Sequence, residues 1–169
     1  MQAVERVVHG IEAVVRLFGW IAAWICVVLV ALVAGDVILR YLFSVGAVWL
    51  QELQWHLISP IALFGMSYLL LMGEQVRVDV FYERFPTALK RVIEVIGGLL
   101  LLAMGLYIAW LTLPWVEQSY LRSEASPNPG GLAFRWALKA LIPFSFLLLA
   151  MQGLAHALRQ GFALPSRGE

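Results

Sequence analysis

Four long apolar runs dominate this chain, and shorter segments between them carry most of the charge. The runs lie at about residues 17–39, 53–72, 92–116 and 136–158. An α-helix rises about 1.5 Å per residue, so roughly 20 residues cross the ~30 Å hydrocarbon layer of a bilayer. Each run reaches that length, so the sequence predicts an all-α integral membrane protein with four transmembrane helices.

The composition excludes the main alternative architectures. Hydrophobic residues make up 62% of the 169 residues and charged residues 14%, so a water-soluble fold would expose large apolar patches. A barrel would show short segments of alternating polarity instead of continuous runs. A net charge of +1 offers no basic surface for nucleic acid. The single cysteine, Cys26, supports neither a disulfide framework nor a cysteine metal site.

The loops between the runs are too short for a soluble domain, so residues 1–169 are predicted to form a single membrane domain. An inner loop spans 73–91 and an outer loop spans 117–135. Ahead of the first run, charged residues that include Glu12 and Arg16 recur at helical spacing, with aliphatic residues on the other side. This pattern predicts an amphipathic helix in the membrane interface that then turns inward, with a frayed terminus as the alternative.

Basic residues near membrane spans tend to stay on the cytoplasmic side, so their distribution predicts the orientation. With both termini inside, the inner segments hold eight basic residues: Arg6, Arg16, Arg77, Arg84, Lys90, Arg91, Arg159 and Arg167. The outer segments hold four: Arg40, Arg122, Arg135 and Lys139. The sequence therefore favours an arrangement with the N-terminus and the C-terminus in the cytoplasm.

Tryptophan prefers the head-group level of a membrane, where its ring is buried and its N–H stays hydrated. All seven tryptophans lie near predicted span ends: Trp49, Trp55, Trp110, Trp115 and Trp136 at outer ends, and Trp20 and Trp24 at the inner start of the first span. We interpret Trp20, Trp24, Trp55, Trp110, Trp115 and Trp136 as interfacial anchors. Their positions agree with the orientation given by the basic residues.

Ionisable groups inside a bilayer are costly unless they are paired or hydrated, so each one is a candidate site. Asp36 and Arg40 lie four residues apart on the first span, the spacing at which opposite charges meet on a helix. We favour a structural ion pair over a role in moving ions.

Glu52, His56 and Ser59 share one face of the second span, and Pro60 leaves the carbonyl of His56 without its helical donor. This face is too polar for lipid. It is therefore expected to point either at the interior of the bundle or at a second polypeptide.

In the third span, Gly97, Gly98 and Gly105 would let another helix approach closely, as small residues do at membrane helix interfaces. Ordinary membrane glycines are the alternative interpretation.

In the inner loop, Arg77 and Asp79 alternate with valines. This pattern favours a segment that folds against another part of the protein or a partner, with a solvated connector as the alternative.

The sequence argues against cofactors and catalysis. Glu52 and His56 have the spacing of half a metal site, but the neighbouring spans lack further ligands. A haem would need two axial histidines at one depth, whereas His56 lies on the outer side and His9 and His156 on the inner side. No phosphate-binding glycine loop or nucleophile motif is present, so we expect neither an enzyme nor a cofactor in this chain.

Several short stretches occur in an order that resembles a known family. They are ArgTyrLeuPhe at 40–43, Trp49 with Glu52, ValArgValAspVal at 76–80, Pro86, and TrpAlaLeuLysAlaLeuIlePro at 136–143. Over nearly its whole length the chain resembles the small membrane subunit, of the DctQ type, of tripartite ATP-independent periplasmic (TRAP) transporters. The family often has histidine before the valine-rich motif, where this chain has Gln75.

This resemblance implies a scaffold subunit in the cytoplasmic membrane of a bacterium or archaeon. The implied partners are a much larger permease subunit, which holds the substrate and sodium sites, and a periplasmic binding protein that delivers a carboxylate-bearing solute. Membrane lipid surrounds the assembly. We expect the contact with the large subunit to be formed or braced by Asp36, Arg40, Trp49, Glu52 and His56, while Arg77 and Asp79 brace the inner loop.

Two other functions compete with this interpretation. A self-sufficient small carrier or channel would use Glu52, Glu94 or Asp36 as its proton or cation site. A membrane anchor of a respiratory complex would bind haem. The four spans lack the repeated halves and broken midplane helices typical of complete secondary transporters, which favours a part of a larger assembly.

Overall fold

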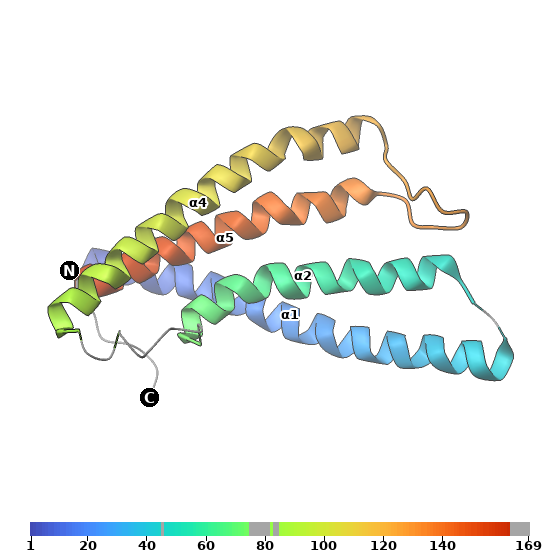
Figure 1. The fold of residues 1–169 in the computed structure, drawn as a ribbon, viewed down its shortest axis with the longest axis horizontal. Helices are drawn as coiled ribbons and strands as arrows, with labels where there is room; N and C mark the ends of the chain where they lie inside the picture. The colour runs from blue at the N-terminus through green and yellow to red at the C-terminus, as the bar shows by residue number, and fades with distance from the viewer. Residues whose placement is uncertain (45, 75–81, 83–84, 163–169) are drawn as a thin grey trace.

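A computed structural model describes residues 1–44, 46–74, 82 and 85–162 of the chain. These residues form four helices and no strand: α1 Gln2–Phe43, α2 Val48–Met72, α4 Thr87–Leu121 and α5 Arg135–Gly161 (Figure 1). Each helix is long and apolar enough to cross a membrane. The prediction of an all-helical membrane protein with four spans is confirmed.

The helices extend beyond the predicted spans. α4 continues to Leu121, so the connection to α5 covers residues 122–134 and is shorter than the predicted loop of 117–135. The backbone hydrogen bonds of a helix continue past an apolar run as long as the following residues tolerate a helix. The length of the apolar run therefore does not predict where the helix ends. We call the end of the bundle with Ser44 and residues 122–134 the outer end, after the predicted orientation.

The inner loop is described only in part. Arg77 and Asp79, predicted to brace it, and Gln75 lie outside the described residues.

α1 is a single helix of 42 residues, about 63 Å long at 1.5 Å per residue. The predicted turn between an interfacial helix and the first span is wrong, because the helix continues through Arg16 without a break. Val8, Ile11 and Val15 are buried against Ala155 of α5. This apolar seam holds the first third of α1 on the bundle, and the place of this part of α1 relative to the membrane surface stays a prediction.

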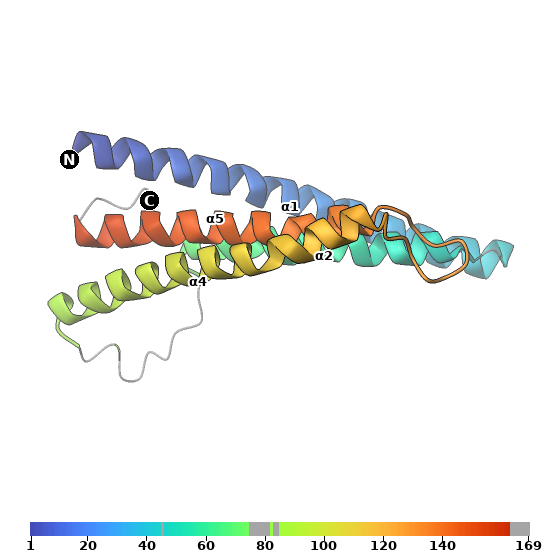
Figure 2. The ribbon, with the colours of Figure 1, turned by 90° about the horizontal axis from the view of Figure 1, so that it is seen from above.

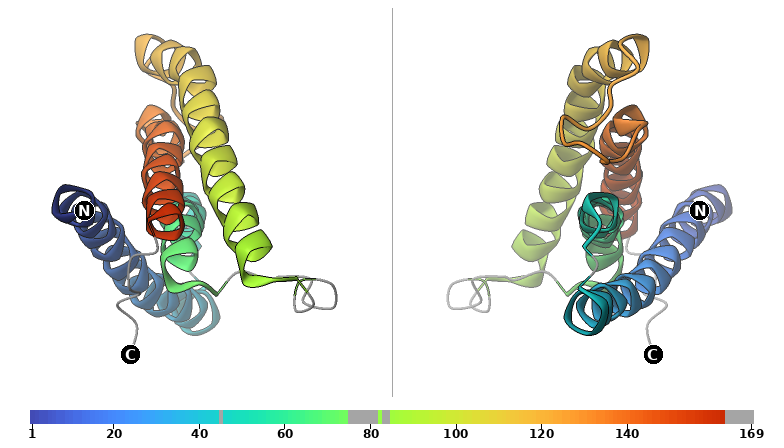
Figure 3. Two further views of the ribbon diagram at one scale, coloured as in Figure 1. Left: turned by 90° about the vertical axis from the view of Figure 1, so that its left-hand side faces the viewer. Right: turned by 90° about the vertical axis from the view of Figure 1, so that its right-hand side faces the viewer.

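The four helices form two antiparallel hairpins, α1–α2 and α4–α5, which diverge toward the outer end (Figure 1). At the inner end α1 and α4 spread apart on either side of α5 (Figure 2). α5 packs against all three other helices, and its contact with α4 is the most extensive. α1 and α4 lie on opposite sides of α5 (Figures 2 and 3). α5 is therefore the centre of the fold.

Glycines allow α4 and α5 to pack in backbone contact. A Cβ atom on Gly98 would lie 2.7 Å from the carbonyl oxygen of Gly153, and one on Gly105 would lie 2.7 Å from that of Phe146. Around Gly97 nothing lies within 4 Å of such an atom. The predicted close helix approach is thus confirmed for Gly98 and Gly105, whereas no helix of the described part of this chain approaches Gly97, where it stays a prediction.

Aromatic rings join the other three helices near mid-depth. Phe18 of α1 lies with its ring centroid 5.0 Å from that of Phe64 on α2 and 5.0 Å from that of Phe144 on α5. Ala22 and Leu148 complete this cluster with Phe64. The contact fixes the two hairpins to each other below the level where they separate.

Candidate functional site

The polar contacts between helices gather at the two ends of the bundle. The outer end holds Asp36, Arg40 and Gln54, the groups around Glu52, and the groups around Glu124. The inner end holds Glu12 with Arg159 and Glu94 with His156. This two-level arrangement suits a bundle whose middle lies in hydrocarbon.

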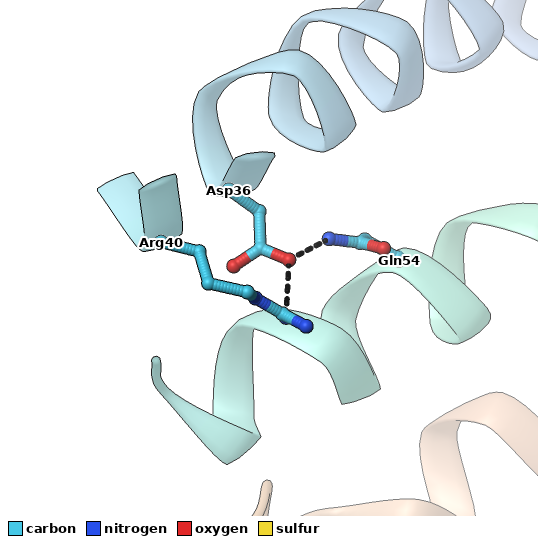
Figure 4. Close-up of polar contacts among 3 residues, drawn as sticks. All are labelled: Asp36, Arg40 and Gln54. Atoms are coloured by element: carbon cyan, nitrogen blue, oxygen red, sulfur yellow. Dashed lines mark hydrogen bonds and ion pairs between the residues drawn. The ribbon is translucent and has the colours of Figure 1, made fainter. Parts of the chain in front are cut away.

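Asp36 joins α1 to α2 at the outer end (Figure 4). Its Oδ2 accepts hydrogen bonds from Nη2 of Arg40 at 3.0 Å and from Nε2 of Gln54 at 3.2 Å. The ion pair predicted from the spacing of Asp36 and Arg40 is present, and Gln54 is a partner that the sequence did not reveal. The Asp36 side chain is 8% exposed and that of Arg40 is 48% exposed, so Arg40 presents one side of its guanidinium outward.

Glu52 is bonded to the segment between α4 and α5. Its carboxylate accepts hydrogen bonds from the Ser126 hydroxyl, from Nδ2 of Asn128 at 3.0 Å and from the backbone N–H of Leu132 at 2.7 Å. The polar face of α2 was expected to point either at the interior of the bundle or at a second polypeptide. The Glu52 carboxylate points at its own chain. It fastens the outer segment to the second turn of α2.

His56 and Trp49, the other predicted interface residues on α2, differ in exposure. Nδ1 of His56 donates to the carbonyl oxygen of Glu52 at 2.7 Å, since a carbonyl only accepts. Nε2 of His56 is buried and has no hydrogen-bond partner among the described residues. Trp49 is 47% exposed. Arg40 and Trp49 therefore point outward, whereas Asp36 and Glu52 are used within the chain.

Glu124 fastens the outer ends of α4 and α5. It accepts hydrogen bonds from Nζ of Lys139 and from the Ser119 hydroxyl, the latter at 2.6 Å, and Nζ of Lys139 lies 4.4 Å from the ring centroid of Trp115. The Lys139 bond, followed by the Ser119 bond, lowers the pKa of the Glu124 carboxyl. A lowered folded-state pKa means that this contact stabilises the fold above the ordinary carboxyl pKa and is lost as the pH falls through the folded-state value.

At the inner end, two carboxylates bind α5 from opposite sides. Oε1 of Glu12 on α1 lies 2.5 Å from Nη2 of Arg159, and both side chains are largely buried. Glu94 of α4 accepts hydrogen bonds from Nε2 of His156 at 2.8 Å and from the Tyr82 hydroxyl at 2.7 Å. Sequence reasoning missed both pairings, because the residues are far apart in the chain and no local pattern links them.

Breaking the Glu12–Arg159 pair is expected to loosen the first third of α1. Glu12→Leu leaves the Arg159 guanidinium largely buried without its anion, which costs about 3–5 kcal/mol for a buried pair. Thermal unfolding of the purified chain in detergent measures the loss. The double variant Glu12→Leu/Arg159→Leu should regain most of the lost stability, and a double variant no more stable than Glu12→Leu contradicts this role.

The predicted tryptophan anchors largely face outward. Five of the six are between 46% and 75% exposed: Trp20, Trp24, Trp55, Trp110 and Trp115. Trp136 instead packs edge-on against Tyr120, with ring centroids 5.3 Å apart. Their function as anchors in the head-group region stays a prediction.

The carboxylates that a small carrier would use have partners within the chain and are not gathered together. Asp36 and Glu52 lie at the outer end, whereas Glu94 lies at the inner end. The described part of the chain contains no group of three or more His, Cys, Asp or Glu side chains that could hold a metal ion.

Comparison with known proteins identifies the family. No curated protein matches the chain. The model of the DctQ component of tripartite ATP-independent periplasmic transporters matches residues 29–162, well over half of the chain, from the middle of α1 to the end of α5. This family is a transporter component and not a class of enzyme. The chain is a multi-pass membrane protein that belongs to the DctQ family of TRAP transporter components.

Proposed function

We propose that this chain is the small scaffold subunit of a secondary active, sodium-coupled TRAP transporter that imports a carboxylate-bearing solute. A large permease subunit would hold the substrate and sodium sites, and a periplasmic binding protein would deliver the solute. The assembly would lie in the cytoplasmic membrane of a bacterium or archaeon, with both termini of this chain in the cytoplasm. Its small size and family membership support this division of labour.

The observation that carries the proposal is the separation of the polar contacts into two levels. Glu12 and Asp36 lie about 36 Å apart along α1, and Lys139 and His156 lie about 25 Å apart along α5. A carrier needs polar groups near the bilayer midplane to hold its cargo. In this bundle the charged side chains bind the helices to one another. This use of charge suits a scaffold subunit better than a carrier with its own solute or ion pathway.

The outward surface suits a subunit embedded beside a larger one. Large apolar side chains on α1 and α4 are more than 45% exposed, among them Val27, Val30, Leu100, Met104 and Leu111. Hydrocarbon or apolar partner helices would cover such surfaces equally well. We assign the polar part of the contact to Arg40 and Trp49, which face outward, with Asp36, Glu52 and His56 bracing them, while Arg77 and Asp79 stay assigned to the inner loop.

Reconstitution into liposomes tests the proposal. The purified chain alone is expected to move neither sodium nor a carboxylate, because it would lack the sites of the large subunit. Sodium-driven uptake should require the large subunit and the binding protein as well. Transport by the isolated chain would favour the self-sufficient carrier instead.

A further inference from the structure

A groove opens between the two hairpins toward the outer end, where α4–α5 diverges from α1–α2 (Figure 1). It consists of two adjoining hollows of about 540 and 810 Å³. Ile58 and Ser59 of α2 and Arg135 and Leu138 of α5 line both hollows, so the two form one continuous space. The deeper part of this space, beside Ala62, Leu63 and Ile142, would lie in the hydrocarbon layer, where lipid or protein fills space in preference to water.

The groove has the depth of one membrane leaflet. Its lining residues run along α2 from Val48 to Leu63, about 22 Å, and along α5 from Arg135 to Ile142, about 10 Å. It ends where Phe64 joins the aromatic cluster near mid-depth. A transmembrane helix of another subunit would need a groove through the whole ~30 Å layer. A lipid of the outer leaflet with its head group needs about 20–22 Å, half of the ~40–45 Å that a bilayer measures with its head groups.

The mouth of the groove carries a cation without an anion bound to it. The Arg135 guanidinium lines the groove and makes no hydrogen bond or ion pair with another residue of the described ranges. Glu52 and Glu124 attract it from nearby, but each carboxylate already accepts hydrogen bonds from other groups. Guanidinium groups bind phosphate with two parallel hydrogen bonds. Polar side chains line the outer part of the groove, and its deeper part is lined by apolar residues that include Ala62, Leu63 and Ile142. A cation at the level of the head groups above this apolar part matches the layout of a phospholipid.

We infer that this groove binds one phospholipid of the outer leaflet. Its phosphate would lie on the Arg135 guanidinium, and one acyl chain would lie between Ala62 of α2 and Leu138 of α5. The lipid would fill the space between the hairpins and complete the bundle. This inference concerns the chain itself and does not depend on the transport function proposed above.

Native mass spectrometry of the purified full-length chain, with added phosphatidylglycerol or diacylglycerol of the same acyl chains, tests the inference. The unchanged chain should retain one phosphatidylglycerol and bind diacylglycerol about tenfold more weakly. Arg135→Gln should reduce phosphatidylglycerol binding to the diacylglycerol level. Ala62→Phe, which fills the groove, should reduce the binding of both lipids.

Matched controls separate this site from general lipid contact. Arg122→Gln removes an exposed cation at the outer end of α4, and Ala103→Phe enlarges an exposed alanine of α4 away from the groove. Both controls should bind lipid as the unchanged chain does, and melting temperatures show that each variant is folded. Equal retention by Ala62→Phe and Ala103→Phe overturns the inference. So does equal affinity of the unchanged chain for the two lipids.

Discussion

Gly98→Leu is expected to separate α4 from α5 and to destabilise the chain strongly. Its first side-chain atom would lie 2.7 Å from the carbonyl oxygen of Gly153 and 2.9 Å from the backbone N of Ala157, and backbone atoms do not move aside without shifting the helix. Overpacking of this kind costs about 3 kcal/mol. Thermal unfolding in detergent should show a melting temperature lower by roughly 5–10 °C.

Gly97→Leu provides the matched control, because it makes the same chemical change one residue away. Nothing lies within 4 Å of a Cβ atom at Gly97, so this variant should unfold close to the temperature of the unchanged chain. Leucine favours a helix more than glycine does, so helix propensity would not explain a loss, and equal destabilisation by the two substitutions would mean that the loss is not specific to position 98. The backbone contact between α4 and α5 would then not be the reason for the glycine.

Glu52→Leu should release the outer segment and weaken co-purification of the large subunit. The variant removes the acceptor of the Ser126 hydroxyl, the Asn128 amide and the Leu132 N–H. Loss of the acceptor costs on the order of 1–3 kcal/mol for a donor that becomes buried and unpaired, and less where water replaces it. Hydrogen exchange at the Leu132 amide should become about tenfold faster, and less of the large subunit should be retained on the tagged chain.

Two further substitutions show whether the effect belongs to the acceptor function of Glu52. Glu52→Gln keeps one side-chain oxygen and should give an intermediate exchange rate. Glu117→Leu removes an exposed glutamate near the outer end of α4 and should change neither exchange nor co-purification. Normal recovery of the large subunit with Glu52→Leu would contradict the assignment of the outer end of α2 to the subunit contact.

The sequence predicted the features that depend on local pattern. Four apolar runs of sufficient length predicted α1, α2, α4 and α5, and the four-residue spacing predicted the Asp36–Arg40 pair. Spacing alone also pointed to glycine-mediated packing, but it did not separate Gly98 from Gly97. That distinction depends on which face of α4 meets α5, which the rotation of two packed helices decides.

The sequence did not predict the long-range polar pairs. Glu52 meets Ser126 across 74 residues and Glu94 meets His156 across 62, so neither pair leaves a periodic trace. The turn expected after Arg16 rests on amphipathic spacing. A helix that lies in the membrane interface and a helix that packs on a neighbouring helix both show this spacing, so it does not distinguish them. The seam of Val8, Ile11 and Val15 against Ala155 belongs to the second kind.

Transport measured in liposomes with and without the large subunit tests the central claim most directly. The chain alone, the large subunit alone and the two together would be compared for uptake of radioactive sodium and of the carboxylate that the cognate binding protein retains. The account predicts background flux for the chain alone and sodium-coupled uptake only when both membrane subunits and the loaded binding protein are present. Sodium or carboxylate flux through the chain alone, abolished by a substitution of Asp36, Glu52 or Glu94, would contradict it.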